Sequence, residues 1–330
     1  MRDPRYLTLL HSGELEERAQ KAERMLASCR VCPHACDINR VGGERGVCGA
    51  AALPAVTSHT LHFGEEPALS GSRGSGTIFF GNCNLRCVFC QNYEISQRPS
   101  AMQNKEVECE RVADMMLELQ QLGAHNINFV SPSHMVPQVL ISLLSAARRG
   151  LRLPLVYNSN GYDSLDSLRL LDGVIDIYLP DLKYGMDEPG ITYSGIVKYA
   201  ETAQTALREM HRQVGLLQTD SEGIARKGLI IRHLVMPRNI SRTYEVLKFI
   251  AEELSPETAV SIMAQYYPAN RAKDFPEIDR PLTADEYDGV YEIAESLGLV
   301  NGWFQSQESE RVYRPDFQRR QVFSREELKE

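Results

Sequence analysis

From residue 77 onward the chain alternates short apolar runs with longer amphipathic segments. The apolar runs predict six strands and the amphipathic segments predict the helices between them. The predicted strands are Thr77–Phe80, Asn126–Val130, Pro154–Tyr157, Val174–Leu179, Gly228–Val235 and Ala259–Gln265. The predicted helices span residues 107–122, 136–149, 163–172, 194–214, 241–254 and 283–297. Such alternation is typical of an α/β fold with a parallel sheet covered by helices.

Six strand–helix units limit the possible architectures. They are too few for a closed eight-stranded barrel, which leaves an open partial barrel or a doubly wound sheet. No Gly-x-Gly-x-x-Gly follows the first predicted strand, because cysteines occupy that loop. A dinucleotide site of the Rossmann type is therefore disfavoured.

The segments before residue 77 and after residue 304 differ from this region in their residue pattern. Residues 14–28 predict a charged amphipathic helix, and residues 29–76 are rich in Gly and Pro and predict irregular structure tied down by cysteines. From Gln305 the chain is polar and mixed in charge, which predicts a solvated terminus or, alternatively, a segment folded over the site. We therefore expect an N-terminal segment (1–76), a central α/β domain (77–304) and a polar tail (305–330).

Composition excludes several classes of protein. The 330 residues include 36 Lys and Arg against 44 Asp and Glu, a formal charge of −8, and 43% are hydrophobic. An acidic balance argues against a general nucleic-acid binder, which presents a basic surface. No apolar run is long enough to span a membrane, and the first residues do not resemble a signal peptide. We expect a cytoplasmic protein with no membrane partner.

Seven of the eight cysteines fall into two clusters, and Cys109 stands apart as an expected core residue. The first cluster is Cys29, Cys32, Cys36 and Cys48, and the second is Cys83, Cys87 and Cys90. A disulfide framework is typical of short secreted chains rather than of a chain like this one. Clustered cysteines here indicate bound metal.

The second cluster has the spacing Cys-x₃-Cys-x₂-Cys and directly follows the first predicted strand. Three thiolates from one loop can converge on one metal centre, one fewer than a fully ligated cluster needs. An open coordination position separates reactive metal centres from structural ones. This spacing therefore indicates a reactive centre.

These residues resemble the radical S-adenosylmethionine (SAM) superfamily, whose loop has this spacing and an aromatic residue before the last cysteine. Glu65-Glu66-Pro67, Gly71–Gly76 and Gln91–Ser96 are similar to the branch of the pyruvate formate-lyase-activating enzyme. The resemblance covers about residues 29–304 and implies a partial (β/α)₆ barrel with parallel strands after a small cysteine-rich segment.

The resemblance also implies cofactors and a reaction. A [4Fe–4S] cluster on Cys83, Cys87 and Cys90 would bind SAM through its open iron and cleave it reductively, and the resulting 5′-deoxyadenosyl radical would abstract hydrogen from a substrate. Phe89 matches the aromatic residue that contacts adenine. The implied partners are a low-potential electron donor of the flavodoxin or ferredoxin type and, in the branch named above, a glycyl-radical enzyme that is activated.

Polar residues just past the predicted strands are the candidates for a SAM pocket, because parallel sheets bind ligands at the carboxyl ends of their strands. The superfamily often has Gly-Gly-Glu after the second strand, and this chain departs from that pattern. Amides and hydroxyls suit ribose or carboxylate groups, and an arginine inside an apolar strand needs an anionic partner such as the SAM carboxylate. The candidates are Ser131, Ser133 and His134 after the second strand, Asn158, Ser159 and Asn160 after the third, Asp181 and Lys183 after the fourth, Arg232 on the fifth, and Gln265 at the end of the sixth.

The first cysteine cluster has four possible ligands within twenty residues. Cys29, Cys32, Cys36 and Cys48 suffice for a tetrahedral zinc site or for a complete iron–sulfur cluster. The spacing alone does not choose between zinc, a second cluster and thiols that stay without metal.

Other functions compete with the radical enzyme. Within the superfamily the substrate is a protein, a peptide or a small molecule. Outside it, a non-catalytic iron–sulfur protein for electron transfer or sensing would need a fully ligated cluster, and a scaffold would use both cysteine groups as structural zinc sites. The three-cysteine loop on an α/β sheet counts against both.

Overall fold

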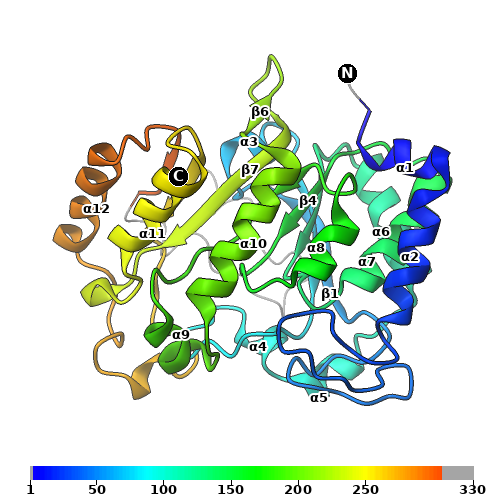
Figure 1. Ribbon diagram of the computed structural model, residues 1–330, viewed down its shortest axis with the longest axis horizontal. Coiled ribbons are helices and arrows are strands. Elements are labelled where there is room, and N and C mark those ends of the chain that lie inside the picture. The colour runs from blue at the N-terminus through cyan, green and yellow to red at the C-terminus, as the bar shows by residue number, and fades with distance from the viewer. Residues whose placement is uncertain (1–2, 307–330) are drawn as a thin grey trace.

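The computed structural model describes residues 3–306, which are organised around one nine-stranded sheet (Figure 1). Six neighbouring strands are parallel, and each overlaps one of the six predicted strands. They are β2 (Ser75–Phe80), β3 (Ile127–Val130), β4 (Leu155–Asn158), β5 (Ile177–Tyr178), β7 (Ala225–Leu234) and β8 (Ala259–Met263).

The parallel strands lie in the sheet in the order in which they follow one another along the chain. A doubly wound sheet reverses its strand order at a switch point, and these six strands do not. The winding in one direction makes the sheet an open barrel, so the predicted partial (β/α)₆ barrel is confirmed.

Helices connect successive strands and cover the outer face of the sheet (Figure 1). The helix predicted over residues 194–214 is present but begins later, at Tyr199, because Gly195 in the left-handed region (φ 68°) ends a preceding helix that was not predicted. The connecting helices are α6 (Cys109–Gln121), α7 (Val136–Arg148), α8 (Leu165–Leu171), α9 (Asp187–Ser194), α10 (Tyr199–Val214), α11 (Thr243–Phe249), which continues as η2 (Ile250–Leu254), and α12 (Ala284–Ser296), with short turns η1 (Pro237–Asn239) and η3 (Ala272–Asp274).

Three strands were not predicted. β1 (Val56–His62) pairs antiparallel with β2 in the segment expected to be irregular, and that expectation was wrong there. Its sequence, Val-Thr-Ser-His-Thr-Leu-His, is mostly polar and half-buried, as suits a strand at the edge of a sheet. The other two are short: β6 (Gln218–Thr219), in a hairpin with β7, and β9 (Gly302–Phe304), parallel to β8 at the opposite edge.

The barrel interior changes from apolar to polar along the strands. At the end where the strands begin, Val156, Ile177 and Ile230 pack with Leu69 of the short helix α3 (Pro67–Ser70), which closes that end. Side chains alternate along a strand, so the residue two positions after Ile230 on the same face is Arg232. The apolar end therefore stabilises the barrel, and the polar residues lie toward the carboxyl ends of the strands.

The N-terminal part covers one side of the barrel. Helices α1 (Tyr6–Ser12) and α2 (Glu14–Arg24) pack against α7, so the helix predicted over residues 14–28 is present but ends earlier. The cysteine-rich segment follows and lies beside α5 (Pro99–Gln103) along the lower edge of the view, near the loops that follow the strands (Figure 1). The helix α4 (Tyr93–Ser96) lies in the same region.

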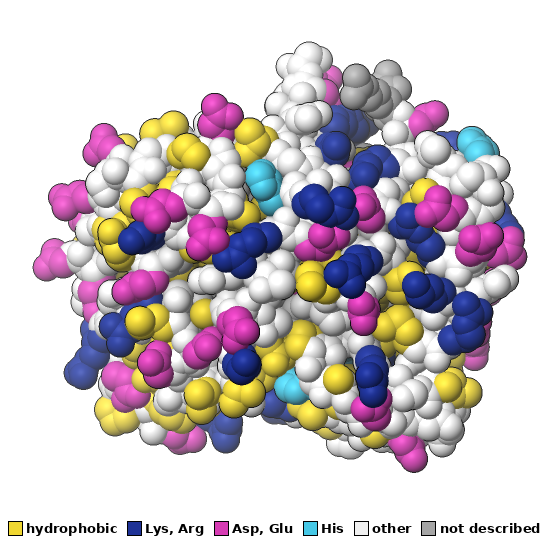
Figure 2. All heavy atoms as spheres, in the orientation of Figure 1, with side chains coloured by type: hydrophobic (Ala, Val, Ile, Leu, Met, Phe, Trp, Pro, Cys, Tyr) yellow, Lys and Arg dark blue, Asp and Glu magenta, His cyan; other side chains and the backbone are white. Residues whose placement is uncertain are grey.

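The face shown in Figure 2 carries Lys and Arg side chains interspersed with Asp and Glu. Ion pairs that join different elements of the fold include Arg212 with Asp172 and Arg208 with Glu253. On the described part of this face we see no continuous basic surface of the kind that binds nucleic acid. Within residues 3–306, no helix has the length and apolar character needed to cross a membrane. The prediction for the polar tail concerns mostly residues 307–330, which lie outside the described residues.

Arg40 joins the cysteine-rich segment to the barrel. Its side chain is buried and donates hydrogen bonds to the carbonyl of Ala51 and, through Nη1, to the carbonyl of His134, both at 2.8 Å. His134 lies in the loop after β3, so this one guanidinium spans the two parts of the chain.

We expect Arg40→Ala to lower the free energy of unfolding by about 2–4 kcal/mol, because it leaves two buried carbonyl oxygens without donors. Urea unfolding under anaerobic conditions measures this loss. Arg30→Ala is the matched control, since Arg30 is an exposed arginine of the same segment that pairs only with Asp37. Equal losses in the two variants would show that Arg40 does not hold the segment in place.

Candidate active site

The loop after β2 carries three cysteines to the carboxyl end of the sheet. Each sulfur lies within hydrogen-bond distance of a polar side chain from a different element. The pairs are Cys83 Sγ with Asn160 Nδ2 after β4 (3.4 Å), Cys87 Sγ with Ser194 Oγ at the end of α9 (3.0 Å), and Cys90 Sγ with Ser96 Oγ at the end of α4 (3.3 Å). Donors placed in this way stabilise a thiolate and orient it.

The three thiols fit an iron–sulfur cluster better than a single metal ion. Burial raises the pKa of Cys83 and of Cys87 to about 11, so both stay protonated unless a metal binds them. Among the described residues, no three Cys, His, Asp or Glu side chains are close enough together to share one ion. The cysteines of a cluster bind separate iron atoms and stand farther apart, which agrees with this arrangement.

A cavity of about 190 Å³ lies directly beside the three cysteines. Its lining includes nine of the eleven residues predicted to bind the cofactor, contributed by the loop and by the ends of β3, β4, β5, β7 and β8. These nine are Phe89, Ser131, Asn158, Ser159, Asn160, Asp181, Lys183, Arg232 and Gln265. The cavity holds polar groups from several strands beside the thiols, as a site for a polar cofactor requires.

Two predicted residues, Ser133 and His134, do not line this cavity. Ser131 adopts a left-handed conformation (φ 60°), and after this turn the chain leads away from the cavity. The His134 imidazole is buried, and its Nε2 lies 3.0 Å from the carbonyl oxygen of Gly81. Burial lowers the pKa of His134 to about 3, so the ring is neutral and supports the start of the cysteine loop.

Arg232 is the centre of a charged network between the strands. Its Nε lies 2.9 Å from Asp181 Oδ1, its Nη2 donates to Asn158 Oδ1 at 2.7 Å, and its Nη1 lies 3.6 Å from Glu65 Oε2. The sequence suggested the SAM carboxylate as the anionic partner of Arg232. In the structure two carboxylates of the protein, those of Asp181 and Glu65, lie beside Arg232, and its contact with the SAM carboxylate stays a prediction.

Asp181 also pairs with Lys183, whose Nζ lies 2.6 Å from Asp181 Oδ2. Burial opposes the ionisation of both groups, but Arg232 and Lys183 lower the pKa of Asp181 below its ordinary value. Asp181 in turn raises the pKa of Lys183. The two residues therefore form an ion pair and also line the cavity, and their contact with a ligand stays a prediction.

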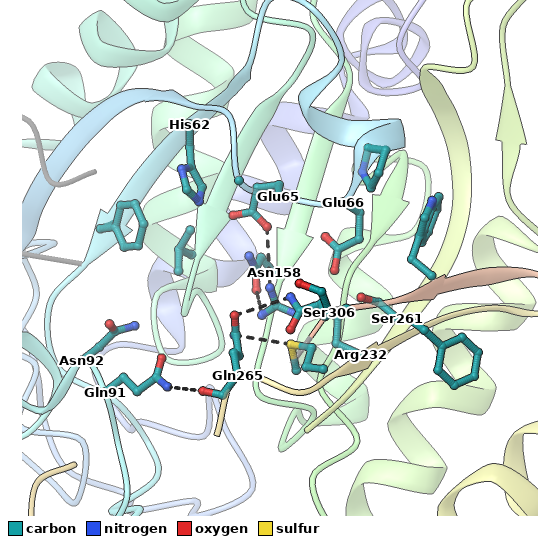
Figure 3. Close-up of a pocket in the computed structure, with 18 residues that line it drawn as sticks. His62, Glu65, Glu66, Gln91, Asn92, Asn158, Arg232, Ser261, Gln265 and Ser306 are labelled. Atoms are coloured by element: carbon teal, nitrogen blue, oxygen red, sulfur yellow. Dashed lines mark hydrogen bonds and ion pairs between the residues drawn. The ribbon is translucent and has the colours of Figure 1, made fainter. Parts of the chain in front are cut away.

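A second cavity, of about 380 Å³, lies deeper in the barrel and was not predicted. His62 at the end of β1 and Glu65 and Glu66 after it point into this cavity, opposite Arg232 and Ser261 (Figure 3). Seven residues line both cavities, so the two adjoin: Gln91, Asn92, Val130, Asn158, Arg232, Met263 and Gln265. We call this second space the lumen cavity. Its sequence signal was a pair of acids directly before a proline, Glu65-Glu66-Pro67.

The four N-terminal cysteines lie near one another and close to the cysteine loop. Burial raises the pKa of Cys32 to about 12, and the proximity of Cys48, Cys29 and Cys36 adds to this shift. The segment contacts the loop through His34, whose Nε2 lies 2.7 Å from the carbonyl oxygen of Asn84. Asn84 follows Cys83 directly, so the two cysteine groups are neighbours in the fold.

An open α/β barrel with three thiols and a polar cavity at the carboxyl ends of its strands defines a cofactor-dependent enzyme. A family model described as "Radical SAM superfamily" matches residues 77–221, which contain the cysteine loop. Residues 77–221 therefore form a radical SAM superfamily domain. A [4Fe–4S] cluster and S-adenosylmethionine are accordingly its cofactors.

Similar proteins cover most of the chain. An uncharacterized protein of Methanocaldococcus jannaschii, MJ0674, is 34% identical over 86% of this chain and 79% of its own length. A second protein of that organism, MJ0808, is 22% identical over 86% of this chain and 81% of its own length. The crystal structure of Streptococcus suis SuiB bound to the precursor peptide SuiA aligns at 12% identity and a TM-score of 0.46, covering 68% of this chain and 46% of that one.

The charged network leads to a pH-dependent prediction. Arg232→Met leaves Asp181 and Glu65 as buried carboxylates without this cation, and we expect it to cost about 3–5 kcal/mol at neutral pH. Burial already raises the pKa of Glu65, and the loss of Arg232 raises it further and removes one of the two cations that lower the pKa of Asp181. Between the unfolded and the folded pKa of these carboxyls, the folded variant binds more protons than the unfolded chain. Its stability therefore falls as pH rises through that range.

The free energy of unfolding in urea is measured for wild type and Arg232→Met at about pH 5 and about pH 7.5, a range in which carboxyls of raised pKa titrate. The difference is expected to be larger at the higher pH. Arg226→Met is the matched control, because Arg226 lies on the same strand and pairs with Asp220 near the surface. A loss that does not change with pH would contradict the charge argument.

Proposed function

We propose that this protein is a radical SAM enzyme in which Cys83, Cys87 and Cys90 hold the [4Fe–4S] cluster and the adjacent cavity holds SAM. The observation that carries the proposal is the position of the three thiols beside a cavity lined by strand-end residues. With both cofactors bound, electron transfer into the sulfonium cleaves SAM and supplies a 5′-deoxyadenosyl radical for hydrogen abstraction.

The protein's own residues prepare this site. Asn160, Ser194 and Ser96 stabilise negative charge on the three sulfurs. Phe89 is buried and packs against Tyr266, with ring centroids 5.9 Å apart, and the two rings form an apolar wall that excludes water. The polar groups of Asn158, Ser159 and Lys183, among others, offer donors and acceptors to a bound ligand.

The proposal extends to substrate and partners. Activation of a glycyl-radical enzyme follows from the branch that the sequence resembles, and modification of a small molecule or peptide is the alternative. The lumen cavity has room for a small molecule or for one residue of a larger chain. A low-potential flavodoxin or ferredoxin is the proposed electron donor, and the cytoplasm is the proposed location.

Formation of 5′-deoxyadenosine tests the proposal directly. Protein purified without oxygen, reconstituted with iron and sulfide and reduced with dithionite is expected to convert SAM to 5′-deoxyadenosine, measured by mass spectrometry. The triple variant Cys83→Ala, Cys87→Ala, Cys90→Ala is expected to lose this activity, and Cys109→Ser, which changes a thiol outside both groups, is expected to keep it. Cluster-loaded wild type that neither binds nor cleaves SAM would favour an electron-carrier function.

We further propose that Cys29, Cys32, Cys36 and Cys48 hold a second iron–sulfur cluster. The thiols lie near one another, and four cysteines complete the ligand set of such a cluster.

Metal analysis of the same variants distinguishes such a cluster from zinc. If both groups hold [4Fe–4S] clusters, the triple variant is expected to retain about half of the wild-type iron and sulfide. One zinc ion per chain, with no iron left in the triple variant, would assign the N-terminal group to zinc instead.

A further inference from the structure

Glu66 places a buried carboxyl group in the lumen cavity, where Ser261 and the charge of Arg232 act on it but one of its oxygens has no hydrogen-bond partner. The residue is only 8% exposed, and its Oε2 has no hydrogen-bond partner among the described residues. Figure 3 shows its carboxyl group pointing into the cavity, on the side opposite Arg232. A buried carboxylate without a partner is costly, so a ligand that donates to Glu66 gains by binding there.

The charges around the cavity leave room for one more cation. The carboxyl groups of Asp181, Glu65 and Glu66 face two cations, Arg232 and Lys183. Asp181 contacts both cations, and Glu65 lies 3.6 Å from Arg232. Glu66 has no ion pair with any described residue, and Glu65 beside it adds negative charge. Burial raises the pKa of both Glu65 and Glu66, and a ligand with one positive charge would balance the network when both are ionised.

The remaining walls are suited to the rest of such a ligand. Trp303 and Phe79 contribute aromatic surface to the cavity, and Trp303 packs beside α3, the helix that begins directly after Glu66. Ser261, Gln91 and Asn92 add polar atoms. An aromatic face attracts an organic cation as well as an alkyl chain. The volume of about 380 Å³ limits the ligand to a small molecule or a single side chain.

We propose that the lumen cavity is the substrate site and that Glu66 binds a protonated amine or guanidinium group of the substrate. This inference rests on the proposed function, because the cavity adjoins the one assigned to SAM. The class of substrate is then an amine- or guanidine-bearing small molecule, or a lysine- or arginine-like residue of a larger one. The apolar part of the substrate lies toward Met263 and Val130, which line both cavities.

Ligand-detected NMR with four probes of similar size tests the proposal. The probes are n-butylamine, n-butylguanidine, butyramide and butyrate, added to the reconstituted protein with and without SAM. We expect the amine or the guanidine to bind wild type in preference to the amide and the acid. The relative affinity of the two cationic probes distinguishes the two sources of positive charge.

Glu66→Gln keeps the shape of the side chain and removes its charge. We expect it to weaken binding of the cationic probe at least about tenfold, the effect of losing a charged hydrogen bond. Glu257→Gln, the same change at an exposed position, is the control and should bind as wild type does. The preference of wild type among the probes tests the proposal even if Glu66→Gln does not fold.

Several outcomes would overturn the proposal: preferential binding of butyramide or butyrate, equal binding to Glu66→Gln, no binding of any probe, or displacement of the cationic probe by SAM. The last result would mean that SAM itself provides the cation. Failure of the proposed function is read separately, as absence of SAM binding and of 5′-deoxyadenosine in protein that still binds the amine.

Discussion

The site depends on one buried arginine in the middle of the barrel. Arg232 lies on the inner face of β7 and contacts Asp181 after β5, Asn158 at the end of β4 and Glu65 after β1. A guanidinium presents donors in a fixed plane, so one side chain sets the relative positions of groups from four parts of the sheet. Arg232 also lines both cavities. The arrangement of the two cavities therefore follows from these contacts.

The N-terminal segment adds a second structure at the same end of the barrel. Arg40 connects it to the loop after β3, and His34 connects it to the residue after Cys83. Both contacts reach backbone carbonyl groups of barrel loops and not side chains. The segment therefore supports the conformation of the loops directly, and the two cysteine groups share one rigid environment.

The barrel could be predicted from the sequence because its strands are largely buried on both sides and are mostly apolar. β1 escaped prediction because an edge strand has a polar, half-exposed pattern, and the acids that follow it were missed with it. Asn158 was found from the rule that ligands bind at strand ends. The same rule also selected His134, which lies outside the cavity because a single left-handed residue, Ser131, redirects the chain. Backbone reversals of this kind leave little trace in a pattern of apolar and polar residues.

The three sulfurs of the cysteine loop receive their polar contacts from three separate parts of the fold: the end of β4, the end of α9 and the end of α4. Hydrogen bonds to sulfur are among the factors that set the reduction potential of a cluster. The reduction potential thus depends on how the β4 loop, α9 and α4 are positioned relative to one another. A movement of α9 or of the β4 loop, caused by a ligand or a partner, would be converted into a change of driving force for electron transfer. The reduction potential of the cluster would then depend on whether α9 and the β4 loop are in the positions seen here.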